Sequence, residues 1–199
     1  MQVKIKKEGK IETFNLINSW SDVTLETWIK LIDFETGTKT EEASKTIVAL
    51  SDIPQRLVRE LALSDVAAIM DQVGKYQQGQ DTSLKRLVSV NGKEYGFHPS
   101  LDDITLGEYA DIETYIKGGV DKNLPELMAI LYRPIKEKKN EVYIISAYDG
   151  DIRMRAEEMK QMSAEQVQSA LVFFYNFAKV LSEILPLYLM ELQKEMKKQ

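Results

Sequence analysis

The amino-acid sequence predicts an α+β fold that is mainly α, built from modules in which a β-hairpin precedes several helices. Two stretches alternate apolar and polar residues around a tight-turn dipeptide, as the strands of a hairpin do. Most of the remaining chain spaces its apolar residues three and four positions apart, which is typical of amphipathic helices. The last of these runs starts near Ser163 and predicts a long apolar C-terminal helix.

The first hairpin is expected at the N-terminus. Glu8-Gly9 stands in the position of a tight turn between two stretches with strand periodicity, whose apolar members are Val3, Ile5, Ile11 and Phe14. Charged residues alternate with these apolar ones, whereas a signal peptide places its charges before a continuous apolar run. We therefore expect a strand pair here and a protein that stays in the cytoplasm.

A second hairpin is predicted around Asn91-Gly92, a dipeptide that favours the two-residue turn between antiparallel strands. A third extended stretch covers 141–148, where β-branched and aromatic residues are frequent. It ends in Asp149-Gly150, which is a turn signal.

Helices are predicted for most of the remaining chain. The expected ranges are 24–33, 38–50, 54–61, from 64 onward, 105–116, 124–132 and from about 163. Pro54 suits the first turn of its helix, with Asp52 as a candidate cap. Ser64 can cap the next helix. The predicted inner stripe of that helix is Val66, Ala67, Met70 and Val73.

Two segments of the chain are similar to each other. Residues 19–28 read SWSDVTLETW and residues 100–109 read SLDDITLGEY, with Ser, Asp, Thr and Leu identical at matching positions. Either hairpin–cap–helix units look alike by chance, or the two segments descend from a distant duplication. A duplication predicts an N-terminal module at 1–80 and a C-terminal module at 81–199, packed as two units or as one domain.

The shared segment carries the signals of a helix N-terminus. Thr24 and Thr105 are the expected N-caps, because a threonine hydroxyl can accept from the free amides of a first helical turn. Asp22 and Asp103 lie just ahead of these caps. We assign all four side chains to holding the fold.

Composition excludes several kinds of site. The chain has 199 residues, a formal net charge of −5, no cysteine and one histidine. Without cysteine there is no disulfide, no thiolate nucleophile and no sulfur-based zinc site, and one histidine cannot build a multi-histidine metal site. A pI near 5.1 argues against a dedicated nucleic-acid binder, which needs a basic face. We expect no cofactor, no metal and no direct nucleic-acid binding.

The segment 171–189 is the candidate for a membrane span. It contains Lys179 and Glu183 near its centre and Pro186 near its end. Each of these residues is costly in a bilayer, so we expect no membrane association.

The sequence contains no familiar catalytic motif. The P-loop, dinucleotide-binding, metalloprotease and serine-hydrolase signatures are all absent. We interpret His98 as a turn or surface residue, because nothing nearby supplies a nucleophile. Carboxylates cluster at Asp102-Asp103 and in Asp149-Gly150-Asp151, but the second group lacks the further ligands of a calcium loop and is interpreted as a turn. We therefore expect a protein that is not an enzyme.

Arg133 lies near the predicted end of the helix at 124–132, just before Pro134. An arginine there can bond the free carbonyls of the helix end. Alternatively it forms an ion pair with Asp111 or Glu113 that locks two helices together. Both roles are structural, and anion binding ranks third.

The C-terminal helix is the most pronounced feature of the sequence. Its apolar residues fall at positions 167, 170, 171, 174, 177, 178, 181, 185, 188 and 189. Further apolar residues widen this stripe, so the helix is apolar nearly all round. Such a helix is either buried at the centre of a domain or keeps one face for a partner, which would be another protein or a second copy of this chain.

Three stretches together resemble a known family. They are ITLGEYADIETYI at 104–116, LPELMAILYRPI at 124–135 and MSAEQVQSALVFFYNFAKVL at 162–181, with an extended piece between the second and the third. Their order and spacing are similar to small morphogenesis proteins of tailed bacteriophages, among them the baseplate hub assembly proteins or tail assembly chaperones of T-even-like phages. The resemblance covers 104–189.

The resemblance implies a non-enzymatic protein that binds other phage proteins, from the tail, baseplate or neck, in the cytoplasm of the infected bacterium. It would act either as an assembly factor that leaves or as a permanent virion component. The residues expected to contact a partner are Phe173, Phe174, Phe177, Leu181, Leu185, Tyr188 and Leu189. A metal-dependent enzyme that uses the acidic clusters is a third hypothesis, which the turn-like spacing of the carboxylates disfavours.

Overall fold

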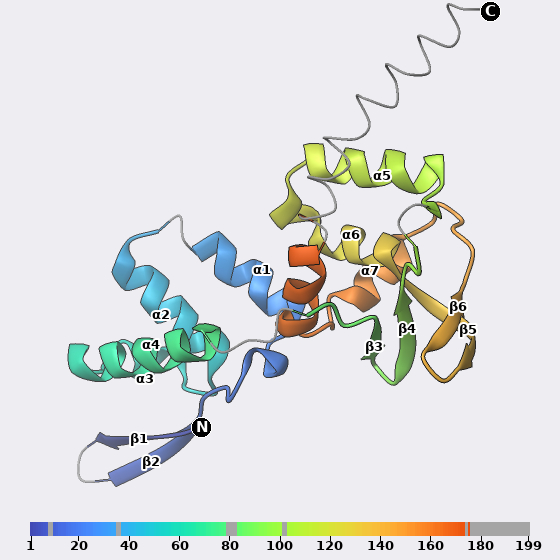
Figure 1. The fold of residues 1–199 in the computed structure, drawn as a ribbon. Helices are drawn as coiled ribbons and strands as arrows, with labels where there is room; N and C mark the ends of the chain where they lie inside the picture. Colours follow the sequence, from blue (N-terminus) through green and yellow to red (C-terminus); the bar gives the residue numbers. More distant parts are fainter. Residues whose placement is uncertain (8–9, 35–36, 79–82, 101–102, 174, 176–199) are drawn as a thin grey trace, which may run out of the picture.

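The computed structural model describes residues 1–7, 10–34, 37–78, 83–100, 103–173 and 175. Its architecture is α+β and mainly α, with one two-stranded and one four-stranded sheet among the described residues, which confirms the predicted fold class. Figure 1 shows the N-terminal hairpin with its helices on one side and the larger sheet with its helices on the other.

The first predicted hairpin is confirmed. Strands β1 (Gln2–Lys7) and β2 (Lys10–Asn15) pair antiparallel, from Gln2 opposite Asn15 to Lys7 opposite Lys10. The predicted turn dipeptide lies outside the described residues. Val3, Ile5 and Phe14 pack against the core of the N-terminal half, whereas Ile11, the fourth apolar position of the predicted alternation, is 64% exposed.

Helices follow the hairpin in the order η1 (Trp20–Asp22), α1 (Leu25–Phe34), α2 (Lys39–Leu50), α3 (Gln55–Val58) and α4 (Leu63–Gln78). Thr24 caps α1 as predicted, since its hydroxyl accepts from the backbone N–H of Thr27 at 3.2 Å. Asp22 lies in η1, where its carboxylate accepts from the backbone N–H of Ser19 and closes a capping box.

Two of the predicted caps are wrong. The carboxylate of Asp52 does not cap α3, because it accepts from the backbone and the side chain of Asn15 and so joins the end of β2 to the end of α2. Ser64 lies inside α4, which begins one residue earlier at Leu63. In the predicted stripe of α4, Val73 is buried and Ala67 is exposed, and Ile69, which the sequence pattern does not predict, is buried as well.

The larger sheet has the order β3-β4-β5-β6 and is antiparallel throughout. Its strands are β3 (Leu87–Val90), β4 (Lys93–Phe97), β5 (Tyr132–Lys139) and β6 (Val142–Ile145). The second predicted turn is confirmed, because Asn91 and Gly92 both have positive φ, at 50° and 77°. Asn140, with φ 57°, lies in the turn between β5 and β6.

The helices of the C-terminal half are α5 (Leu106–Lys117), η3 (Val120–Asn123), α6 (Leu124–Leu131), α7 (Arg153–Met159) and a last helix that starts at 164. This last helix is described at 164–173 and at 175, and the rest of the predicted long helix lies outside the described residues. Thr105 caps α5 in a full capping box with Glu108, as the sequence predicts.

Two elements of this half are not predicted by the sequence pattern. The helix predicted to reach Tyr132 ends at Leu131, and Tyr132 begins β5. The eight residues of β5 include a run of exposed charged residues, so the sequence shows no strand periodicity there. Helix α7 is short and has no side-chain cap at its start, so it lacks the signals by which helices are found.

The core divides into two clusters of buried side chains. One gathers residues of the N-terminal half around Ile47, Leu50 and Ile53, and the other gathers residues of the C-terminal half around Tyr95, Phe97 and Met128. Backbone bonds join the halves where α1 and the last helix begin: Leu25 N–H donates to Met162 O, and Ala164 N–H donates to Val23 O, both at 2.7 Å. Leu25 belongs to the second cluster although it starts α1.

The β5–β6 hairpin curls over β4. A register shift at Ile135 and Glu137 bends β5. As a result the ring of Tyr143 lies directly over Gly96, and its hydroxyl donates to the carbonyl of Phe97 at 2.7 Å. This contact fixes the path of β6, which forms one wall of the groove described below.

Candidate functional site

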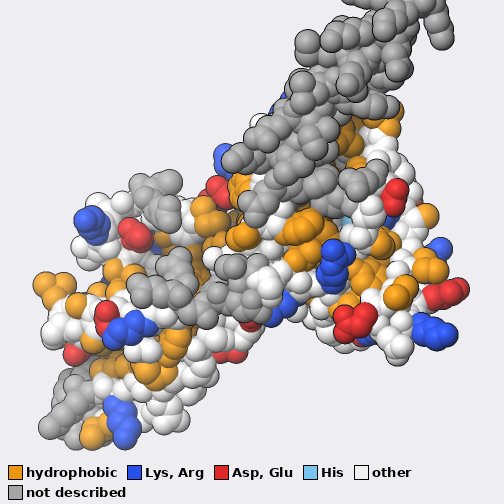
Figure 2. Space-filling view, viewed as in Figure 1, with side chains coloured by type: hydrophobic (Ala, Val, Ile, Leu, Met, Phe, Trp, Pro, Cys, Tyr) orange, Lys and Arg blue, Asp and Glu red, His pale blue; other side chains and the backbone are white. Residues whose placement is uncertain are grey.

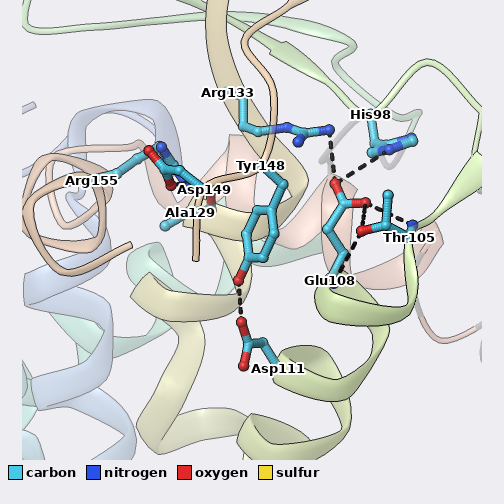
Figure 3. Close-up of polar contacts among 9 residues, drawn as sticks. All are labelled: His98, Thr105, Glu108, Asp111, Ala129, Arg133, Tyr148, Asp149 and Arg155. Carbon is cyan, nitrogen blue, oxygen red and sulfur yellow. Dashed lines mark hydrogen bonds and ion pairs between the residues drawn. The ribbon is translucent and has the colours of Figure 1, made fainter. Parts of the chain in front are cut away.

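A buried group of polar side chains lies where α5 meets β4 and β5 (Figure 3). We call Glu108, Arg133, His98 and Thr105 the Glu108 cluster. Only 1% of the surface of Glu108, 5% of Arg133 and 8% of His98 is exposed. Charged groups are rarely buried this deeply unless they are paired, so the contacts of the cluster decide whether this part of the fold is stable.

Both carboxylate oxygens of Glu108 are engaged. One oxygen lies 2.9 Å from Nη2 of Arg133 and 3.6 Å from Nε2 of His98. The other accepts from the backbone N–H of Thr105 at 2.8 Å and from its hydroxyl at 2.6 Å. The capping-box glutamate of α5 is therefore also the counter-ion of an arginine on β5.

The electrostatics of the cluster favour an ionised glutamate and a neutral histidine. Burial pushes the pKa of Glu108 upward, but the hydrogen bonds from Thr105 and the charge of Arg133 outweigh it and leave that pKa below its ordinary value. Burial lowers the pKa of His98 by more than the neighbouring carboxylate raises it. The cluster thus holds one full ion pair beside an uncharged imidazole.

Further contacts extend the cluster toward α6 and α7. The Arg133 guanidinium lies 5.9 Å from the centre of the Tyr148 ring, and the hydroxyl of Tyr148 donates to the carboxylate of Asp111. Nε of Arg155 donates to the carbonyl of Ala129 at 2.6 Å (Figure 3). These bonds tie α5, α6, α7 and the segment after β6 together.

Three expectations about these residues are corrected. His98 is buried beside Glu108 and is not a turn or surface residue. Arg133 lies within β5 and not at a helix end, although its assigned role in holding the fold agrees with its buried ion pair. Its partner is Glu108, whereas Asp111, one of the two carboxylates expected, binds Tyr148.

The sequence contains a signal that leads to Glu108. Thr105 and Glu108 have the three-residue spacing of a capping box, which places the glutamate at the start of α5. What the spacing does not reveal is Arg133, which is distant in sequence and reaches Glu108 only through the pairing of β5 with β4.

A surface groove of about 490 Å³ opens beside the Glu108 cluster. Residues from the end of β4 and the start of α5 form one side, and consecutive residues of β6 and the segment after it form the other. Its lining residues are His98, Pro99, Ser100, Asp103, Thr105, Glu108, Arg133, Tyr143, Ile144, Ile145, Ser146, Ala147 and Tyr148. Asp103, predicted to hold the fold, is an exposed residue on the rim.

The residues expected to contact a partner fall mainly beyond the described chain. Phe173 is described, and its ring packs edge-on against Phe97 with the ring centres 5.4 Å apart. Phe174, Phe177, Leu181, Leu185, Tyr188 and Leu189 lie outside the described residues. Near the last described positions of the helix, Val172 is 39% exposed and Tyr175 is 54% exposed.

The acidic turn Asp149-Gly150-Asp151 is a turn, as predicted. Gly150 has φ 77°, and the backbone N–H of Asp151 donates to the Asp149 carboxylate. In the part of the chain that the structure describes, no three His, Asp or Glu side chains are placed to hold a metal ion.

Comparisons with known proteins do not identify a relative, so the site is interpreted from its geometry. No protein-family model matches the chain, and no curated protein or solved structure is significantly similar to it. Within the described residues, no helix is long and apolar enough to cross a membrane.

The Glu108 cluster predicts that acid destabilises the protein in two stages. As the pH falls below about 6.5, an unfolded chain protonates His98 while the folded chain does not, so the free energy of unfolding falls. Below about 4.5 the unfolded chain also protonates Glu108 before the folded chain does, and the free energy falls further. Urea unfolding measured at a series of pH values checks both stages.

His98→Gln isolates the first stage, because His98 is the single histidine of the chain. We expect the variant to lose most of the pH dependence between about pH 7 and pH 5.5 and to keep the acid stage. An unchanged slope over the upper range would show that His98 is not the group that titrates there.

Proposed function

We propose that this chain is a non-enzymatic morphogenesis protein of a tailed bacteriophage, which binds other phage structural proteins while the tail or baseplate is assembled. Such a protein would act in the cytoplasm of the infected bacterium. The sequence resemblance over 104–189 supports the proposal, and so does the Glu108 cluster, in which one carboxylate oxygen pairs with Arg133 on β5 and the other caps α5 through Thr105.

One observation carries the binding part of the proposal. The last helix buries Val167 and Ala170 completely but leaves Val172 and Tyr175 exposed. By helical spacing, positions 177, 181, 185 and 188 continue the stripe of Val167 and Ala170, so Val172 and Tyr175 belong to a second apolar face. Figure 2 shows hydrophobic side chains gathered on the surface where the described chain ends. An apolar helical face beyond what the core uses is the kind of surface by which a helix binds a partner.

The proposal extends to the architecture. Each half runs from a hairpin to a threonine-capped helix and then to a second helix: β1–β2, α1 and α2 in one, β3–β4, α5 and α6 in the other. This shared order supports a distant duplication, with modules at 1–80 and 81–199 and a long C-terminal helix added to the second. Native-state hydrogen exchange of the full chain tests it, since two modules should open at different free energies.

Quantitative mass spectrometry of purified virions and of infected-cell lysate tests the phage role. Abundance in the lysate with absence from virions is the expected result for an assembly factor. A fixed copy number per virion would instead make the chain a permanent structural component, for which the same apolar face would be a lasting interface. Absence from both would overturn the phage assignment.

Acidic substitutions on the exposed face and on the apolar stripe of the predicted C-terminal helix should reduce partner binding. We expect Tyr175→Asp and Leu181→Asp to lower the recovery of phage proteins that co-purify with the full chain by about tenfold or more. Leu181 lies outside the described residues, so its role rests on the sequence pattern. Affinity purification from infected cells with quantified phage proteins measures the effect.

Leu63→Asp is the matched control, because Leu63 is 84% exposed and lies at the start of α4, on another element. It should leave recovery and melting temperature unchanged, since an acidic residue is favourable in a first helical turn. If Tyr175→Asp and Leu181→Asp both fold and recover as much partner as the control, neither face of the predicted C-terminal helix is the interface.

A further inference from the structure

The edge strand β6 is unusual in its side chains. It is the last strand of the sheet, and its sequence Val-Tyr-Ile-Ile contains no charge. Val142 is 75% exposed and Ile144 is 56% exposed. Natural proteins usually protect a sheet edge with charges, prolines or a covering element, because an open edge pairs readily with another strand. Figure 2 shows exposed hydrophobic side chains on the side of the molecule where β5 and β6 lie.

The backbone of β6 presents free pairing groups. Successive residues of an antiparallel strand point their N–H and C=O groups alternately toward the neighbouring strand and away from it. Ser146 N–H donates to Pro134 O on β5. By the same alternation, the backbone groups of Val142 and Ile144 also point toward β5. The backbone groups of Tyr143 and Ile145 therefore point away from β5, and no described residue outside the sheet accepts from their N–H groups.

This edge borders the groove beside the Glu108 cluster. The groove is lined by the consecutive residues 143–148, which include neighbours that point to opposite faces of the sheet. An unbroken run of this kind means that the edge of the strand, and not one face of it, forms the wall. A chain lying in the groove would meet the free backbone groups of Tyr143 and Ile145 on this side.

The lining defines the chemistry of the occupant. Pro99, Ile144, Ile145 and Ala147 contribute apolar surface, and the charge of Arg133 is already neutralised by Glu108 at 2.9 Å. A charged side chain placed in the groove would find no free counter-ion in its buried part. An extended segment with β-branched or other uncharged side chains meets both the edge and the lining.

A second copy of this chain suits the edge less well. The free edge is short, because β6 has four residues. Pairing two such strands buries far less than the roughly 1,200 Å² that stable interfaces need, and a strand held in its own hairpin cannot enter the groove. A single extended segment gains both the backbone bonds and the groove.

We propose that the edge of β6 and the adjoining groove bind an extended, uncharged segment of a partner protein by strand addition. This inference rests on the proposed function, since it assigns a second contact to a protein whose role is to bind other proteins. The bound segment would pair with the backbone of Tyr143 and Ile145 and place alternate side chains in the groove beside the Glu108 cluster.

A displayed library of random heptapeptides, selected against the full chain, tests the proposal. The enriched peptides should be rich in Val, Ile and Thr and poor in charged residues. A fluorescently labelled copy of the best peptide then serves as the probe for affinity measurements. Enrichment of charged peptides, or none above background, would overturn the proposal.

Ile145→Pro and Ile145→Ala form a matched pair for the backbone contact. Proline removes the outward N–H of this residue without breaking a bond to β5, and it is tolerated on sheet edges. We expect proline to weaken peptide binding by about tenfold and alanine, which keeps the N–H, by less than about threefold. Equal binding by the two variants would exclude strand addition at β6.

Hydrogen exchange of the unmutated chain gives a readout that does not depend on the variants folding. Peptide binding should slow exchange at Tyr143 and Ile145, while protection confined to another strand or helix would overturn the assignment. A dimer that Ile145→Pro abolishes would make a second copy the occupant and overturn it as well. These measurements use purified chain and peptide, so they are independent of the virion experiment. If the peptide binds but the chain is absent from both virions and lysate, only the phage role is rejected.

Discussion

Gly96→Ala is expected to destabilise the protein by about 3 kcal/mol, although alanine is normally the better residue in a strand. A Cβ at this position would lie 2.6 Å from Cδ2 of Tyr143 and 2.9 Å from Cγ2 of Ile145. The ring cannot move away cheaply, because its hydroxyl is bonded to Phe97 O and the side chain is buried. Urea denaturation gives the free energy of unfolding.

Gly74→Ala supplies the control of opposite sign. Gly74 lies in α4 with nothing within 4 Å of the position its Cβ would take, so alanine should stabilise by about 0.5–1 kcal/mol. A double-mutant cycle with Tyr143→Ala identifies the clash with the ring: in that background Gly96→Ala should cost less, with the contact to Ile145 remaining. If Gly96→Ala is as stable as the unmutated chain, β6 does not cross β4 as described.

Arg133→Met is expected to destabilise the protein by about 3–5 kcal/mol, because it leaves the Glu108 carboxylate buried without its counter-ion. Glu108 is held by Thr105 and cannot turn toward water. Replacing both partners, as Arg133→Met with Glu108→Gln, should recover a large part of this loss, since no unpaired charge then remains in the core. Equilibrium unfolding of the two single variants and the double variant measures the coupling.

The pair Lys117–Glu113 is the matched control on the same helix. Its charged atoms are also 2.9 Å apart, but the side chains are 73% and 50% exposed. Lys117→Met should therefore change the free energy of unfolding by less than about 1 kcal/mol. Similar losses for Lys117→Met and Arg133→Met would mean that burial does not set the strength of the Glu108 cluster.

Local signals account for the parts of the fold that could be predicted. Asn91-Gly92 specifies its turn because asparagine and glycine tolerate positive φ, and both adopt it here. Thr105 specifies the start of α5 because its hydroxyl and the Glu108 side chain satisfy the backbone within a few residues. In such cases the residues that decide the structure are neighbours in sequence.

The misplaced elements depend on partners far along the chain. Tyr132 reads as the end of an apolar helix, yet it becomes a strand residue because it pairs with Phe97 on β4 and its ring packs edge-on against the Phe97 ring. Asp52 has the character of a helix cap, but Asn15 offers it two donors. Tertiary contacts of this kind outweigh local preferences worth about 1 kcal/mol.

By itself, the sequence determined the fold class, the turn between β3 and β4, the caps of α1 and α5, and the apolar spacing of the last helix. It could do so because backbone preference, capping and periodicity each act over a few neighbouring residues. Only the tertiary structure decided that Glu108 meets Arg133 and His98, that Tyr143 covers Gly96, and that β6 is an open edge beside a groove. Those relations follow from strand order and packing, which bring distant residues together and which no short-range pattern encodes.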